Sequence, residues 1–230
     1  MAQGSSVWGL ILATGRGQQL TSGAETAFLG IGSRPALAHV LAAFEGCAEI
    51  EAVVVVAARE RLDDVRALNR RFGAAKMARV VPGFQARRAS VRAGLEALGE
   101  DAAFVVVHDA ARPCVKPAQI AAVAQAARRH GNGVMAAQVT EPVVEVSGRA
   151  MKSDRGLWDR AIWTLQTPQC YRRELLEKML KAADRKRLKI EDEAAALPLV
   201  GESIRLVPTE FLNLRLRAAD DLALAAQLLP

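Results

Sequence analysis

The chain has few of the residues that build metal clusters and disulfide frameworks. It contains only three cysteines and three histidines in 230 residues. Cys47, Cys114 and Cys170 are odd in number, far apart and never in a CxxC pair, so their spacing favours neither disulfides nor a zinc site. We expect the cysteines to be small core residues, and His39 and His130 to be structural.

Long apolar runs are also missing, and the first residues show no pattern of a secretory leader. The composition is 51% hydrophobic, yet no run approaches the roughly 18 apolar residues that cross a bilayer. The N-terminus lacks a charged region followed by a long apolar stretch. We therefore expect a cytoplasmic protein without membrane contact. A chain of this length can bury a full core without disulfides, and a single domain over residues 1–230 is predicted.

Aromatic residues make up only 4% of the chain, with one tyrosine, whereas basic residues give a net charge of +6. The basic balance suits an anionic ligand. Without interleaved aromatic residues, the stacking platforms of single-strand binders are missing. We therefore expect a nucleotide rather than a nucleic acid as the partner. Nonspecific binding to nucleic acid is an alternative hypothesis, which predicts a steep loss of affinity as the salt concentration rises.

Short β-rich runs alternate with longer segments of helical period, which predicts an α/β fold with a mostly parallel sheet. The expected strands are 7–13, 53–57, 79–81, 104–107 and 133–139. The expected helices are 35–45, 60–72, 87–98, 117–129, 172–186 and 218–229. The rhythm breaks at about 140–162, where we expect either a hairpin arm that serves subunit contacts or a plain surface insertion.

The most informative stretch is an apolar strand that ends in His108-Asp109-Ala110-Ala111-Arg112-Pro113. Ligands of open α/β sheets bind at the carboxyl ends of the strands. Asp109 is therefore a candidate metal ligand, and Arg112 is a candidate partner for phosphate or carboxylate. The alternative is that Asp109 caps a turn and Arg112 only pairs with it.

A glycine loop follows the first expected strand. It contains Ala13-Thr14-Gly15-Arg16-Gly17, in which two glycines let backbone N–H groups approach a phosphate. The loop is neither a Walker loop nor a dinucleotide fingerprint, and a bare turn is the alternative. Its position after the first strand is the usual nucleotide edge of a doubly wound sheet, so phosphate binding is favoured.

Further motifs accompany these two segments in order along the chain. They are Gly83-Phe84-Gln85-Ala86-Arg87-Arg88-Ala89-Ser90-Val91-Arg92-Ala93-Gly94-Leu95, Gln166-Thr167-Pro168-Gln169, Glu191-Asp192-Glu193-Ala194, Asn213-Leu214-Arg215-Leu216 and Asp221-Leu222-Ala223-Leu224-Ala225. The ordered set resembles the 2-C-methyl-D-erythritol 4-phosphate cytidylyltransferases of the non-mevalonate isoprenoid pathway.

This resemblance implies a three-layer, Rossmann-like nucleotidyltransferase fold with a projecting β arm. It also implies a homodimer that binds CTP and Mg²⁺, and that transfers CMP to a sugar-alcohol phosphate with release of pyrophosphate.

The resemblance assigns roles to individual residues. Asp109 matches the family's metal-binding acid, Gly15 and Gly17 match its phosphate loop, and Ser90 matches a contact to the nucleotide base. Gly83 opens the segment that lies against cytosine in the family. Three basic residues match contacts to anionic groups: Arg112, Arg215 and, on the arm, Arg160, although an alignment without a gap puts Asp159 in that place.

The chain departs from the family where charge matters most. Gln19 and Thr26 occupy the positions of the family's catalytic Arg and Lys, and neither can neutralise phosphate charge. Arg16 is a candidate replacement. Where the family has a Gly-Gly-Asp segment against cytosine, this chain has Gly83-Phe84-Gln85. On the arm, Pro142 stands where the family has a Thr that offers its hydroxyl to the substrate.

Two functional hypotheses follow from this pattern. The first is an active cytidylyltransferase-type enzyme that uses CTP or another nucleotide. The second is a catalytically impaired paralogue that acts as a nucleotide-binding or regulatory dimer.

Overall fold

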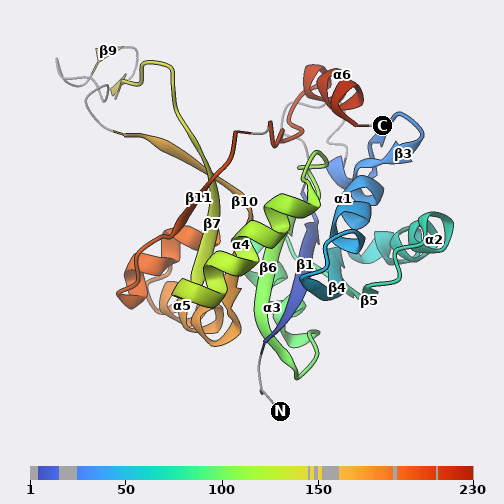
Figure 1. The fold of residues 1–230 in the computed structure, drawn as a ribbon, viewed down its shortest axis with the longest axis horizontal. Helices are drawn as coiled ribbons and strands as arrows, with labels where there is room; N and C mark the ends of the chain where they lie inside the picture. Colours follow the sequence, from blue (N-terminus) through green and yellow to red (C-terminus); the bar gives the residue numbers. More distant parts are fainter. Residues whose placement is uncertain are drawn as a thin grey trace.

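The computed structural model describes residues 5–15, 25–144, 146–147, 150–151, 161–188, 191–210 and 212–229. Its centre is a seven-stranded sheet (Figure 1). In order across the sheet, the strands are β11 (Leu206–Pro208), β7 (Asn132–Gln138), β10 (Trp163–Arg172), β6 (Ala102–Asp109), β1 (Ser6–Ala13), β4 (Ile50–Ala57) and β5 (Met77–Pro82). Only β10 runs antiparallel to its neighbours in this sheet. The expected mostly parallel α/β sheet is therefore confirmed.

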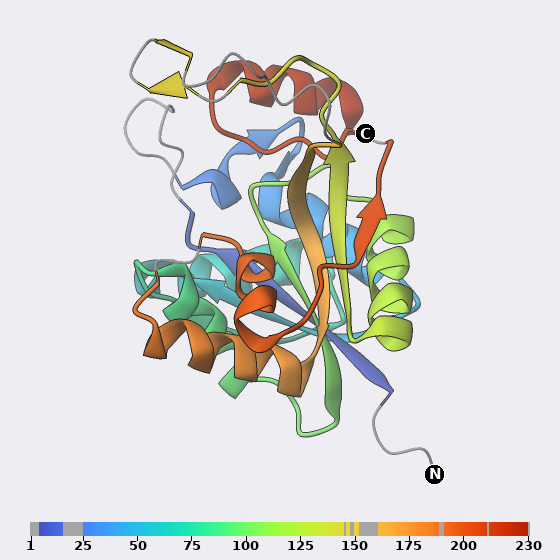
Figure 2. The same ribbon diagram turned by 90° about the vertical axis from the view of Figure 1, so that its left-hand side faces the viewer.

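Helices cover both faces of the sheet (Figure 2). One face packs against α1 (Ala36–Glu45), α2 (Leu62–Phe72) and α4 (Pro117–His130). The other packs against α3 (Arg87–Glu96), α5 (Arg173–Arg185) and the 3-10 helix η4 (Glu193–Val200). β1, β4 and β6 lie between the two layers, which explains their continuous apolar runs.

Smaller elements complete the fold. They are the 3-10 helices η2 (Thr26–Phe28) and η3 (Arg59–Arg61), the strand pairs β2 (Gly30–Ile31) with β3 (Arg34–Pro35) and β8 (Val146–Ser147) with β9 (Ala150–Met151), and helix α6 (Ala219–Leu228). A third apolar cluster packs α6 against β2, with Ile31, Cys114, Leu216 and Ala225 in its interior.

All five predicted strands and all six predicted helices are present, with shifted ends. Strands β10 and β11 of the main sheet, and the short pair β2 and β3, are not among the predicted strands. Strand β10 contains Pro168, which normally argues against a central strand. The structure accommodates Pro168 because the register of β10 on β7 breaks between Leu165 and Gln169, so this residue needs no ladder hydrogen bond.

The expected β arm lies between β7 and β10. Its two short strands, β8 and β9, pair with each other and not with the main sheet, and β9 stands away from that sheet (Figure 1). The predicted role of the arm in subunit contacts stays a prediction. Pro142 is exposed, and the other arm position of interest, Arg160, lies outside the described residues, as does Asp159.

Two further expectations concern burial and membranes. Cys47, Cys114 and Cys170 are buried and unpaired, as expected of small core residues. His39 is buried, with Nε2 bonded to the Ile31 carbonyl at 3.1 Å. None of the helices in the described part of the chain has the length and apolar character needed to cross a membrane.

We expect Gly133→Ala to destabilise the protein. A Cβ on Gly133 would lie 2.5 Å from the Val123 carbonyl oxygen and 2.7 Å from the Ala126 Cβ, where α4 crosses β7 and neither backbone can yield. Overpacking of this kind costs about 1–3 kcal/mol. For a chain of this size, thermal denaturation should show a midpoint lower by about 2–4 °C for each kcal/mol.

The matched control is Gly30→Ala in β2. Its Cβ would meet nothing within 4 Å, so its midpoint should stay within about a degree or two of the parent, as for an ordinary surface substitution. Equal midpoints for the two variants would contradict the packing argument.

Candidate functional site

The polar cleft of interest lies at the carboxyl ends of the central parallel strands. It has a volume of about 1030 Å³, and of the residues predicted for the site it is lined by Thr14, Gly15, Thr26, Gly83, Asp109 and Arg215. These residues come together because β1, β4, β5 and β6 all end at the same edge. A larger depression of about 1250 Å³ lies at the opposite edge and contains none of the predicted site residues.

Three predicted residues do not line this cleft. Ala13 is the last residue of β1 and is buried. Ser90 is fully buried and Arg112 is 9% exposed. The predictions for Gly17, Gln19 and the alternative cation Arg16 fall on residues 16–24, outside the described residues.

Asp109 ends β6 and faces the cleft from a buried position. Its Oδ1 accepts a hydrogen bond from Arg87 Nη1 at 2.6 Å, and its Oδ2 lies 3.9 Å from Arg215 Nη2. Its backbone N–H donates to Thr167 Oγ1 at 3.0 Å. Burial raises the pKa of Asp109, but Arg87 and Arg215 outweigh burial and bring this pKa below its usual value. Asp109 is therefore an ionised carboxylate.

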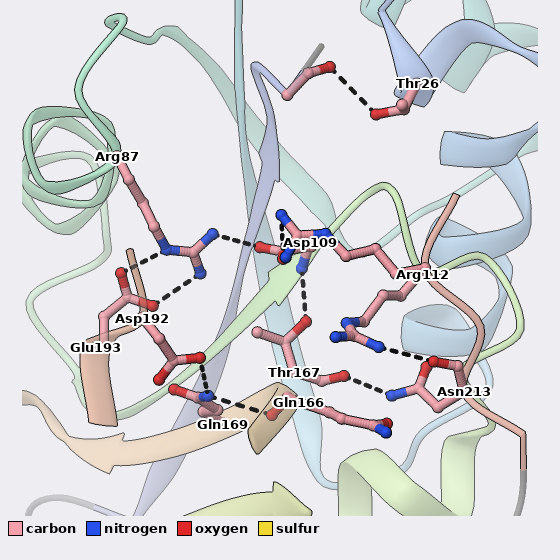
Figure 3. A network of polar contacts seen from close by, with 12 residues as sticks. Thr26, Arg87, Asp109, Arg112, Gln166, Thr167, Gln169, Asp192, Glu193 and Asn213 are labelled. Atoms are coloured by element: carbon pink, nitrogen blue, oxygen red, sulfur yellow. Dashed lines mark hydrogen bonds and ion pairs between the residues drawn. The ribbon is translucent and has the colours of Figure 1, made fainter. Parts of the chain in front are cut away.

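Arg87 joins Asp109 to a second buried carboxylate (Figure 3). Its Nε and Nη2 donate to the two oxygens of Glu193, each at 2.8 Å. Burial lowers the pKa of Arg87, but the charges of Glu193 and Asp109 raise it well above its usual value. Burial raises the pKa of Glu193, and Arg87 offsets this rise only in part. Glu193 is therefore the first of the two carboxylates to take up a proton on acidification.

Hydrogen bonds connect three of the sequence motifs behind the cleft (Figure 3). The Thr167 carbonyl accepts a bond from Asn213 Nδ2 at 2.7 Å, and the Asn213 carbonyl accepts one from Arg112 Nη1 at 2.8 Å. Since Thr167 also holds the Asp109 backbone, one chain of bonds runs from Asp109 to Arg112. Arg112 thus supports the segment that carries Arg215, and its predicted contact to an anion stays a prediction.

Burial lowers the pKa of both basic residues in the motif His108-Asp109-Ala110-Ala111-Arg112-Pro113. It lowers the pKa of His108 to about 4. His108 Nε2 lies 3.1 Å from the Arg112 carbonyl, which can only accept, so the proton of the neutral ring is on Nε2. Burial also lowers the pKa of Arg112, to about 10. At neutral pH His108 is therefore uncharged, whereas Arg112 keeps its charge.

Thr26 is hydrogen-bonded to Gly15 of the glycine loop. Its hydroxyl and its backbone N–H both donate to the Gly15 carbonyl, at 3.1 Å and 3.2 Å, and the residue is 3% exposed. Next to it, the Glu25 carboxylate accepts a bond from Arg61 Nε at 2.5 Å. The position at which the resemblance expects a lysine therefore holds a neutral side chain that fixes backbone, beside an acid that is already paired.

Ser90 holds the loop that follows β5. Its hydroxyl donates to the Phe84 carbonyl and accepts a bond from the Phe84 N–H, both at 2.9 Å. The hydroxyl is thus engaged with the protein backbone, so in the described structure Ser90 bears on the cleft through the loop that it fixes. Its predicted contact to a base stays a prediction.

Several charged residues that line the cleft were not among the predicted site residues. Arg59, Arg87, Arg88 and Arg187 line it in addition to Arg215. Arg88 pairs with Asp184 at 2.8 Å and donates to the Leu188 carbonyl, whereas the guanidinium groups of Arg59 and Arg187 make no hydrogen bond to the described residues. A signal was available for Arg59, because it follows the expected strand 53–57 by two residues, at the ligand edge of the sheet.

The donor set at Asp109 fits one kind of metal ion. No group of three or more His, Cys, Asp and Glu side chains within the described ranges could hold a metal. Mg²⁺ bound with phosphates needs only one or two carboxylates, since phosphate oxygens and water supply the remaining ligands. Asp109 offers one ionised carboxylate in the cleft and meets that requirement. A dedicated all-protein metal cage does not fit these residues.

The fold and the cleft together define a Rossmann-like α/β protein of the nucleotidyltransferase type. Comparison with known proteins agrees: the family model described as "IspD: 2-C-methyl-D-erythritol 4-phosphate cytidylyltransferase" matches residues 7–230. The chain belongs to this family. The resemblance found in the sequence motifs is therefore confirmed.

Individual relatives support the same assignment. A 2-C-methyl-D-erythritol 4-phosphate cytidylyltransferase of Pelotomaculum thermopropionicum is 33% identical, with 94% of this chain and 91% of the relative aligned. A bifunctional IspD/IspF enzyme of Desulforudis audaxviator is 35% identical over 96% of this chain but only 56% of its own length. The crystal structure of the Thermus thermophilus cytidylyltransferase matches with a TM-score of 0.76 at 30% identity, covering 98% of both chains.

We expect Arg87→Met to destabilise the protein in a pH-dependent way. The change leaves Asp109 and Glu193 buried without their shared cation, which costs about 3–5 kcal/mol at neutral pH. Burial then raises both carboxyl pKa values above those of the unfolded chain, so the folded state binds more protons. When the folded state binds more protons than the unfolded chain, the free energy of unfolding falls as the pH rises. Thermal denaturation should therefore show a smaller deficit, relative to the parent, at pH 5 than at pH 7.

Arg66→Met is the control, because Arg66 forms an exposed ion pair with Asp63 on α2. Exposed pairs of this kind contribute about 0–1 kcal/mol, so this variant should follow the parent at both pH values. An equal deficit for Arg87→Met at pH 5 and pH 7 would argue against the role of the two buried carboxylates.

Proposed function

We propose that this chain transfers the CMP group of CTP to 2-C-methyl-D-erythritol 4-phosphate, with release of pyrophosphate, in isoprenoid precursor synthesis. The observation that carries the proposal is the ionised, cation-flanked Asp109 at the carboxyl end of β6, in a chain of this family. The named activities of the relatives, including the Pelotomaculum protein, supply the nucleotide and the alcohol phosphate.

In this reaction a phosphate oxygen of the alcohol phosphate attacks the α-phosphorus of CTP. A new P–O bond forms there as the bond between the α-phosphorus and the bridging oxygen breaks, and pyrophosphate leaves with that electron pair. Little covalent chemistry falls to the protein. Its residues position the two anions and neutralise the developing charge.

The described cleft offers groups for both tasks. Gly15 and Thr14 present backbone at the end of β1, and Arg59 adds a guanidinium that makes no hydrogen bond to a described residue. Asp109 would hold Mg²⁺, and that ion when bound supplies charge neutralisation on the nucleotide phosphates. Arg215, 51% exposed at its side chain and 3.9 Å from Asp109, would meet the phosphate of the second substrate.

The impaired-paralogue hypothesis depends on Gln19 and Thr26 alone. Thr26 is uncharged and cannot neutralise phosphate, and its hydroxyl donates to the Gly15 carbonyl. Arg59 lines the same cleft and offers a cation from a different element. We therefore propose an active enzyme in which the phosphate-facing charge has moved from the glycine loop to the end of β4. A homodimer in the cytoplasm remains part of this prediction.

A pyrophosphate-release assay with CTP, 2-C-methyl-D-erythritol 4-phosphate and Mg²⁺ tests the proposal. The parent chain should turn over, and Asp109→Asn should lower kcat/KM by about 10²–10³, the usual cost of losing one preorganised charged group. Asp63→Asn, on an aspartate that is 93% exposed at its side chain, is the control and should leave turnover unchanged. If the parent chain is inactive, the hypothesis of an active enzyme is rejected. Activation by the joint changes Gln19→Arg and Thr26→Lys would then support the hypothesis of an impaired paralogue.

Arg59→Gln should weaken CTP binding by about tenfold or more, since a charged hydrogen bond to phosphate contributes about 1.5–3 kcal/mol. Isothermal titration at two salt concentrations measures the effect, and the salt dependence of the variant should be shallower. Arg70→Gln, on the exposed face of α2 outside the cleft, is the control. Equal CTP affinity in the two variants would remove Arg59 from the phosphate site.

A further inference from the structure

Two large apolar side chains stand exposed in the otherwise polar cleft. Phe84 is 55% exposed and Leu188 is 42% exposed, and both line it. A single exposed apolar residue is ordinary on a protein surface. Here two come from different elements, the loop after β5 and the segment after α5, and open onto the same volume. The other exposed large apolar side chains among the described residues are Val144, Leu206, Leu212, Leu224 and Leu228, and none lines this cleft.

The backbone under Phe84 is fixed from two sides. The buried Ser90 hydroxyl bonds both the N–H and the carbonyl of Phe84 at 2.9 Å. The preceding Gly83 packs so closely that a Cβ there would lie 2.3 Å from Thr14 Cγ2 and 2.8 Å from Val56 Cγ1. The aromatic ring is therefore carried by a rigid loop that rests on the root of the glycine loop.

Leu188 is fixed from the same helix that fixes Phe84. Its N–H donates to the Ala183 carbonyl at 3.1 Å, and its own carbonyl accepts a bond from Arg88 Nη1 at 2.6 Å. Arg88 and Ser90 both lie in the first turns of α3. The backbones that carry the two apolar side chains are thus both tied to α3, which lowers the cost of ordering them around a flat ligand.

The cleft offers two kinds of surface. Gly15, Arg59 and Asp109 supply backbone and charge at the ends of β1, β4 and β6, Arg215 adds a guanidinium, and Phe84 and Leu188 supply apolar surface. A nucleoside triphosphate likewise has a polyanionic tail and a flat ring with apolar faces. Its phosphates match the charges of the cleft, and the faces of its ring match Phe84 and Leu188.

We propose that Phe84 and Leu188 form a clamp for the nucleobase, in which stacking on Phe84, rather than hydrogen bonds to the edge of the base, supplies most of the base-dependent affinity. The inference rests on the proposed nucleotide site and names how that site holds the base. Every base has a stacking face, so the clamp takes a purine ring as well as cytosine. Gln85, a neutral amide beside the clamp, can donate or accept toward either ring.

Calorimetric titration of Phe84→Ala with CTP, ATP and inorganic triphosphate, each with Mg²⁺, tests the clamp. Loss of base stacking should weaken both CTP and ATP by about 5- to 100-fold. The affinity for inorganic triphosphate, which has no base, should stay within twofold of the parent. Phe84→Tyr keeps the aromatic face and should restore both nucleotide affinities.

Leu206→Ala is the matched control, since Leu206 is an exposed apolar residue on edge strand β11, outside the cleft. It should leave all three affinities unchanged. Unchanged CTP affinity in Phe84→Ala would overturn the clamp, and so would a loss for CTP without one for ATP, or an equal loss for triphosphate. A chain that shows the expected binding pattern but no turnover with 2-C-methyl-D-erythritol 4-phosphate would refute the proposed reaction and leave the clamp standing.

Discussion

The arrangement of the cleft depends on the guanidinium of Arg87, which lies between two buried carboxylates. Taking three charges out of water is costly, and their mutual attraction repays this cost only when the geometry is good. Here Arg87 donates two hydrogen bonds to Glu193 and one to Asp109. A fourth contact, at a longer distance, joins Arg215 to Asp109. Because Arg87 begins α3, Glu193 begins η4 and Asp109 ends β6, this cluster fixes three elements relative to one another.

The cluster also sets the charge of the cleft. One cation shared by two acids leaves a local excess of negative charge, which Arg215 relieves from the solvent side. The surrounding hydrogen bonds then fix the backbone: Thr167 holds Asp109, Asn213 holds Thr167, and Arg112 holds Asn213. Of the residues named by the sequence motifs, some open onto the cleft, and others, including Ser90 and Arg112, keep those residues in place. Thr26 lines the cleft and also holds the Gly15 backbone.

Much of the fold was predictable from the sequence, because hydrophobic period and helix-ending glycines are local signals. Gly73 and Gly131 end α2 and α4 with positive φ, as helix ends commonly require. The position of Asp109 was predictable for the same reason, since a residue just past a buried strand must reach the ligand edge. The target of Arg87 was not, because Glu193 lies 106 residues away and no local pattern specifies such a pairing. The hydrogen bonds from the Ser90 and Thr26 hydroxyl groups to backbone carbonyls were also not predictable. A hydroxyl can bond a ligand or a nearby carbonyl equally well.

Strand β10 connects the cleft to the arm in a way that bears on how the family can change. It begins where the arm returns to the body, and its residue Thr167 supports Asp109. Gln169 to Arg172 pair with β6, and both Trp163 to Leu165 and Gln169 to Tyr171 pair with β7, so two ladders hold this strand from both sides. An insertion or deletion in the excursion before Trp163 would therefore fall ahead of the first paired residue of β10. We expect that the arm can differ in length between relatives without moving Asp109.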